Sequence, residues 1–206
     1  TGTIVQTGGV VNAYSYVVLG AGSTYDGETL PTGVLDISGG EFRLHANRIE
    51  VGRGTGGEGV INISGTGHLK LLNNSSVAMG FGSSDGFSGS FDGTVNQTGG
   101  SVTFYGDGGS SIGGSGALIL GIDANPGMDG VYDNPVLTYN LDGGTLTVPQ
   151  IQRNATDGSQ SIFNFNGGVL VAARNNETWM QGLTQANVKA GGAIIDSNGF
   201  DVTIAQ

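Results

Sequence analysis

The sequence predicts an all-β fold, a parallel β-helix (β-solenoid) of about seven irregular coils, from a repeated phrase, a glycine-rich composition and alternating apolar residues. The phrase is an apolar residue, Asp or Asn, a spacer, a small polar residue, one or two glycines and further alternating apolar residues. It is clearest over residues 34–44. The first glycines of its seven copies are Gly8, Gly39, Gly65, Gly99, Gly143, Gly167 and Gly199. Such a recurrence with elastic spacing predicts stacked structural repeats.

The composition favours turns and short strands, because 41 of the 206 residues are glycine and only 12% are charged. The glycines lack the three-residue period of collagen, and the apolar alternation between them argues against disorder. The repeats run from the first residues to the last. We therefore expect a single β-solenoid domain over residues 1–206, with a loop insertion around 105–135 and a composition that permits a short helix around 175–188.

The apolar positions of the phrase predict which side chains face the core. The fourth residue before the first glycine is Ile4, Leu35, Ile61, Val95, Tyr139, Phe163 or Ile195. Side chains alternate across a strand, so residues two positions apart share one face. A further apolar segment follows each early corner, at residues 17–20, 49–52, 77–80 and 118–121. Each repeat is thus expected to contain at least three strand segments. A β-sandwich, the main rival, would not repeat one phrase so faithfully.

The polar positions of the phrase predict a ladder of stacked side chains. The third residue before the first glycine is Asp36, Asn62, Asn96, Asn140, Asn164 or Asp196, and only Val5 interrupts the series. Amides stacked one above another hydrogen-bond along the stack and fix its register. A flat polar stripe that binds a regular lattice, such as a glycan or ice, is the functional alternative. We favour register control.

The charge excludes several classes of partner. The net charge is −10 and no basic patch is present, so we expect no nucleic-acid binding. No run approaches the roughly 18 apolar residues of a membrane span, so we expect no membrane insertion. The chain begins at Thr1 without a signal peptide, as a mature or excised chain does. The absence of cysteines leaves the redox compartment open. The acidic, polar and glycine-rich composition favours an extracellular or cell-surface location.

The best catalytic candidates are His45 and His68 together with Glu41, Arg43 and Lys70. A polysaccharide lyase needs a group that neutralises a uronate and a base that removes a proton, and this set supplies both. The alternation along the strands, however, predicts that Glu41, Arg43, His68 and Lys70 point away from the core. Mixed charges at such positions usually only form a solvent-exposed surface. We expect no catalytic residues and no enzyme activity.

Two further groups of residues have both a functional and a structural interpretation. The oxygen ligands of Asp123, Asn125, Asp129 and Asp133 form a weak Ca²⁺ candidate, although their spacing matches neither an EF-hand nor a glycine-rich Ca²⁺ repeat. An ordinary loop is the simpler interpretation, and no other cofactor is expected. Trp179 is a candidate for stacking on a sugar, but packing against the end of the coils is favoured.

The phrases at residues 140–146, 163–170 and 192–204 resemble those of bacterial autotransporter-associated β-strand repeat proteins. The resemblance covers essentially the whole chain. It implies a right-handed β-helix, export, and a role in adhesion, matrix or filament building. It supplies no catalytic residues.

These observations predict a non-enzymatic structural or adhesive module of a surface or secreted bacterial protein. Residues 4–5 and 202–204 are ordinary repeat phrases without a polar cap. We therefore expect the strand edges and the apolar core to be open at both ends of this chain. A second copy stacked end to end, or neighbouring repeats of a longer chain, would cover them. The alternative is a carbohydrate-active module, either a polysaccharide lyase or a glycan-binding protein.

Overall fold

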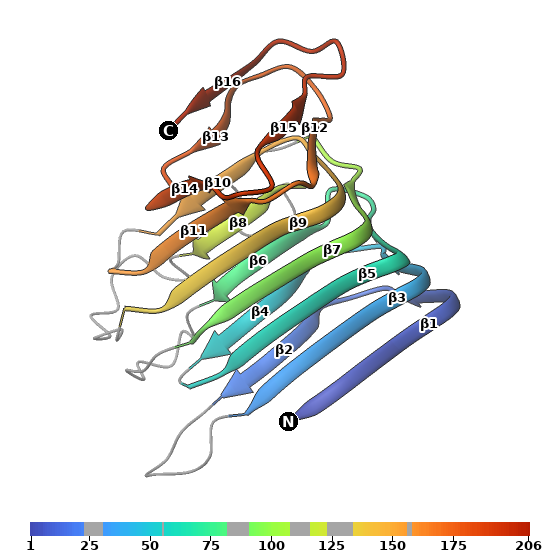
Figure 1. Ribbon diagram of the computed structural model, residues 1–206. Coiled ribbons are helices and arrows are strands. Elements are labelled where there is room, and N and C mark those ends of the chain that lie inside the picture. The colour runs from blue at the N-terminus through green and yellow to red at the C-terminus, as the bar shows by residue number, and fades with distance from the viewer. Residues whose placement is uncertain (23–30, 55, 82–90, 108–115, 123–133, 156–157) are drawn as a thin grey trace.

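In the computed structural model, which describes residues 1–22, 31–54, 56–81, 91–107, 116–122, 134–155 and 158–206, every regular element is a β-strand. The prediction of an all-β fold is confirmed. The strands form two parallel sheets in which successive repeats lie one above another from the N-terminus to the C-terminus (Figure 1). This arrangement is consistent with a β-solenoid. No helix in the described part is long and apolar enough to cross a membrane.

The first sheet contains nine strands, with the order β1-β3-β5-β7-β9-β11-β14 and two further strands at its side. Its main strands are β1 (Gly2–Ala13), β3 (Thr32–Leu44), β5 (Glu58–Leu71), β7 (Gly93–Phe104), β9 (Val136–Val148), β11 (Gln160–Phe165) and β14 (Gln185–Val188). At the side, β12 (Val169–Ala172) pairs with β9 and with β15 (Ile194–Asp196). The chain bends at its glycines within the long strands, so the halves before and after the bend remain in one ladder.

The second sheet has the order β16-β13-β10-β8-β6-β4-β2. Its strands are β2 (Val17–Gly22), β4 (Arg48–Gly54), β6 (Ser76–Phe81), β8 (Leu118–Ile122), β10 (Ile151–Asn154), β13 (Asn176–Gln181) and β16 (Val202–Ala205). From β1 to β11 the chain alternates between the sheets, so neighbours in a sheet come from successive repeats. Parallel pairing requires such crossovers. The predicted insertion at 105–135 includes β8, while its residues 108–115 and 123–133 lie outside the described part.

The register of the first sheet follows the repeated phrase. Asp36 lies beside Asn62, which lies beside Asn96, and in these two strand pairs the pairing shifts at the glycine corners. At one corner Gly100 has φ of +60°, and a Cβ added there would lie 2.1 Å from the carbonyl oxygen of Gly67. A residue without a side chain is needed there for both the backbone angle and the close approach.

The inward side chains of both sheets form one hydrophobic cluster that extends from Leu19 to Leu183. In it the rings of Tyr139 and Phe163 stack with their centres 5.2 Å apart. The Tyr139 hydroxyl donates to Oε1 of Gln97 at 2.7 Å, and the Gln97 amide donates to the Thr145 carbonyl at 3.0 Å. Burial raises the pKa of Tyr139 above its usual range, so its hydroxyl remains a donor.

The last repeat differs from the prediction that its corner is at Gly199. Ala186 of β14 lies beside Phe163, and Ile195 of β15 lies beside Leu170, so Ile195 follows the corner instead of preceding it. The corner is formed by Gly191 and Gly192, where the Gly192 carbonyl accepts a hydrogen bond from the Gly167 amide at 3.0 Å. Pairing with the preceding repeat decides the register, whereas residues 195–199 match the phrase only locally.

The prediction of a short helix around 175–188 is also wrong, because this segment contains β13 and β14. Met180 pairs with Ile151 in the second sheet, and Trp179 is fully buried, with its ring N–H donating to the Val148 carbonyl at 2.9 Å. Pairing and burial outweigh the local helical propensity. Trp179 therefore packs inside the protein, as favoured, and offers no ring to a sugar.

Three glycine variants separate backbone strain from close approach at the corners. Gly9 has φ of +67° but open space around an added Cβ, and Gly8 has neither constraint. We expect Gly8→Ala to change the free energy of unfolding by at most about 0.5 kcal/mol, and Gly9→Ala to lower it by about 1–2 kcal/mol. Gly100→Ala is expected to cost more than Gly9→Ala. Urea denaturation measures all three, and equal losses for Gly100→Ala and Gly9→Ala would contradict a role for close approach.

Candidate functional site

A ladder of hydrogen-bonded side chains runs along the outer surface of the first sheet. Each amide nitrogen donates to the Oδ1 atom of the preceding repeat. The links are Asn62 to Asp36 at 2.6 Å, Asn96 to Asn62 at 3.0 Å, Asn140 to Asn96 at 2.9 Å, Asn164 to Asn140 at 2.8 Å and Asn187 to Asn164 at 3.0 Å. Parallel strands in register place these residues one above another, so the ladder follows from the pairing. Its donors are used within the protein, which suits register control.

Asp196 is not part of this ladder. It lies in β15 beside Val171, and its Oδ1 accepts a hydrogen bond from the backbone N–H of Asn198 at 2.7 Å. The last rung is Asn187, which the sequence prediction missed. In the sequence, Asn187 stands between the apolar residues Ala186 and Val188, as the ladder residues of other repeats do. Its glycine corner follows only at Gly191, which is farther along the chain than in the repeated phrase.

The predicted catalytic residues only partly come together. The register places Glu41 beside His68 and Arg43 beside Lys70. The Glu41 carboxylate pairs with Arg43 and, at 2.7 Å, with the Lys70 ammonium. The hydrogen bonds from Lys70 and Arg43 hold the pKa of Glu41 below its ordinary value. These three side chains form a partly exposed cluster in which two cations share one carboxylate.

The two histidines have separate partners instead of sharing one site. His68 Nδ1 lies 2.7 Å from the Ser101 hydroxyl. His45 Nε2 lies 2.9 Å from Oδ1 of Asn12, and its ring stacks on Tyr14 with centres 4.6 Å apart. Neither histidine contacts Glu41 among the hydrogen bonds and ion pairs of the described residues. A joint acid–base site is not assembled here.

A polar groove lies where the links between the two sheets differ in length. Val148 of β9 is connected to Ile151 of β10 by Pro149 and Gln150 alone. In the next repeat, Ala172 pairs with Val148 and Met180 pairs with Ile151. The corresponding link is therefore longer and contains residues 173–179. The groove beside the short link has a volume of about 410 Å³. It is lined by Asp107, Gln150, Arg174, Asn175, Asn176, Glu177 and Thr178.

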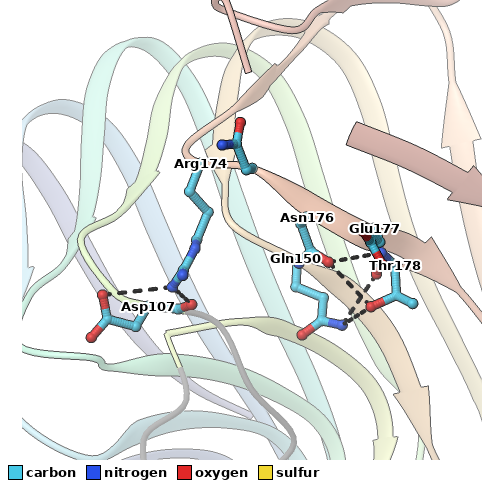
Figure 2. Close-up of a pocket in the computed structure, with 7 residues that line it drawn as sticks. Asp107, Gln150, Arg174, Asn176, Glu177 and Thr178 are labelled. Atoms are coloured by element: carbon cyan, nitrogen blue, oxygen red, sulfur yellow. Dashed lines mark hydrogen bonds and ion pairs between the residues drawn. The ribbon is translucent and has the colours of Figure 1, made fainter. Parts of the chain in front are cut away.

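The walls of the groove are held by hydrogen bonds between repeats. Figure 2 shows Arg174 reaching Asp107, with Gln150, Asn176, Glu177 and Thr178 gathered together. The Arg174 guanidinium donates to the Asp107 carbonyl and lies 3.6 Å from its carboxylate. The Gln150 amide donates to the Thr178 carbonyl at 3.1 Å. The sequence did not predict this groove, because its one sign there is the short link at residues 149–150.

The predicted Ca²⁺ ligands Asp123, Asn125, Asp129 and Asp133 lie outside the described residues. In the segments that are described, no group of three or more His, Cys, Asp or Glu residues is arranged to hold a metal ion. The Ca²⁺ candidate therefore stays a prediction. The ladder, the charged cluster around Glu41 and the groove are the polar features on which function can be argued.

Two matched substitutions test the direction of the ladder. In Asn96→Asp a carboxylate oxygen replaces the amide that faces Asn62 Oδ1, so we expect the free energy of unfolding to fall by about 1–3 kcal/mol. Asp36→Asn keeps the acceptor at the end of the ladder and removes only the carboxylate charge, so it is expected to lower the free energy of unfolding by less than about 1 kcal/mol. Denaturation at neutral pH measures both. Equal losses would contradict the donor direction.

A pH series tests the Glu41 cluster. Because the pKa of Glu41 is lowered in the folded state, its charge stabilises the fold above the ordinary carboxyl pKa. That contribution is lost as the pH falls through the lowered value. The difference in urea midpoint between wild type and Glu41→Gln should therefore be constant near neutral pH and shrink in acid. It should also shrink in high salt, since the cluster is partly exposed. A difference independent of both would contradict the ion pairs.

No model of a protein family matches this chain, and no curated protein matches it. No solved structure matches it either. The resemblance to autotransporter-associated repeats therefore stays a prediction.

Proposed function

We propose that this chain is a non-enzymatic structural or adhesive module of an extracellular or cell-surface bacterial protein. In this proposal it is a right-handed parallel β-helix of about seven coils that extends end to end into fibres or matrix. The seven strands in the main order of each sheet support the coil number. The acidic, polar and glycine-rich composition supports the location.

The observation that carries the proposal is the exposure of core positions at both ends. At the first end Ile4 is 47% exposed and Val11 is 40% exposed, although the residues stacked on them, Leu35 and Phe42, are buried. At the other end Val188 is 66% exposed and Ile195 is 44% exposed. Ile195 ends the inward column that begins at Val11, and Val188 ends another inward column of the first sheet, stacked on Phe165. A further turn of similar sequence would cover them.

The strand directions favour one mode of assembly. β1 and β14 lie at opposite ends of the first sheet, and β2 and β16 lie at opposite ends of the second. All strand pairings within the sheets are parallel. A second copy stacked in the same orientation would continue both sheets with parallel pairing. Such a contact joins unlike surfaces and leaves one of each free, so it produces open filaments.

The side chains of the central repeats favour a structural role over a lyase. A lyase base must be free to take a proton from its substrate. Lys70 and Arg43 instead share the Glu41 carboxylate. The Asn ladder uses its amides to hold repeats together, which serves the stability of a rod.

Charged substitutions at the ends test the assembly. We expect wild type to form linear species whose length increases with concentration, as measured by sedimentation velocity and electron microscopy. Ile4→Asp blocks one end and Val188→Asp blocks the other, so each variant alone should stop growing. A mixture of the two should form one-to-one complexes, because each variant supplies the end that the other has lost.

The control is Thr147→Asp, which places the same charge on the side of β9. It is expected to assemble as wild type does. Wild type that remains monomeric at high concentration would overturn the end-to-end proposal. Lateral growth insensitive to Ile4→Asp and Val188→Asp would overturn it as well.

A further inference from the structure

The groove beside Pro149 and Gln150 is built from fixed parts. The amide of Asn176 donates to the Pro149 carbonyl at 2.8 Å, and its Oδ1 accepts from the Thr178 backbone N–H at 2.8 Å. The Asn175 side chain accepts a hydrogen bond from the Asp201 backbone at 2.9 Å. These bonds join three successive links between the sheets. The walls are therefore arranged before any ligand arrives, which reduces the entropy lost on binding.

Several polar atoms that line the groove are not used in these internal hydrogen bonds. The Gln150 amide nitrogen is used by Thr178, and Figure 2 shows the Gln150 oxygen directed away from that contact. The Asn175 amide nitrogen makes no hydrogen bond within the described residues, and neither does the exposed Glu177 carboxylate. Arg174 has further N–H groups beyond its contact with Asp107, and its side chain is 44% exposed. The groove thus presents both donors and acceptors.

The chemistry of the lining selects the class of ligand. Two carboxylates, of Asp107 and Glu177, accompany the single cation of Arg174, and the chain has a net charge of −10. An anionic ligand is therefore disfavoured. All seven lining residues are polar or charged, so the groove offers no apolar pocket for the side chains of a peptide. Hydroxyl groups, which both donate and accept, match such a lining.

We propose that this groove binds a short segment of a neutral oligosaccharide. Its volume of about 410 Å³ lies within the roughly 300–1,000 Å³ of small-ligand sites. The Glu177 carboxylate and the Arg174 guanidinium make charge-assisted hydrogen bonds to sugar hydroxyls. The Gln150 oxygen and the Asn175 amide orient the segment from the floor and the wall. The site lies on the side of the stack, so it does not depend on end-to-end assembly.

Titration of the full chain with neutral oligosaccharides tests this site. The probes are cello-, manno-, xylo- and galacto-oligosaccharides, with oligogalacturonate and an unstructured peptide as comparators. We expect at least one neutral probe to bind, with backbone amide NMR shifts concentrated in residues 149–150 and 174–178. Glu177→Gln should weaken binding about tenfold, because a neutral amide replaces a charged acceptor. Glu58→Gln makes the same change on β5, away from the groove, and should leave binding unchanged.

Each other outcome overturns the inference. Absence of binding by every neutral probe at millimolar concentration would remove the site. Binding that is equally weakened by Glu177→Gln and Glu58→Gln would place the ligand elsewhere. Preference for oligogalacturonate or the peptide would refute the ligand class. Thermal melting checks that Glu177→Gln remains folded, and the end-to-end proposal stands or falls separately by sedimentation.

Discussion

Parallel pairing in register between successive repeats is the constraint on which the rest of this structure depends. It stacks the inward residues into one core and the outward amides into one ladder. It also brings backbone atoms so close at the corners that a Cβ at Gly100 would meet the Gly67 carbonyl. Each repeat is stable only against its neighbours, because a single turn cannot bury its own apolar face. The geometry of the corners and the composition of the core therefore have one cause.

Sequence periodicity predicted the strands, the core and most of the ladder, because each depends on residues at fixed distances from a glycine corner. It failed at the last repeat, where residues 195–199 match the phrase but Asn187 and Gly191 occupy the stacked positions. Local similarity does not reveal pairing with a distant strand. The groove was missed for a related reason: it arises from the difference between two links, and neither link carries a motif.

The molecule divides its polar residues between two tasks. In the ladder and in the cluster around Glu41, side chains bond mainly to one another. In the groove, Glu177 and part of Gln150 remain available to a ligand. The links between the sheets differ in length, yet Val148 still pairs with Ala172 and Ile151 with Met180. For the proposed ligand site, this means that the side of the stack can vary while the core stays constant.

The ladder also gives the stack an electrical polarity. All its amides point the same way, with nitrogen toward the preceding repeat, so their dipoles add along the axis as peptide dipoles do in a helix. The positive end of this column lies at Asp36, where a carboxylate replaces the amide. An acidic residue there neutralises the accumulated partial charge, much as aspartate does at the start of a helix. The choice of Asp over Asn at the first rung thus has an electrostatic reason.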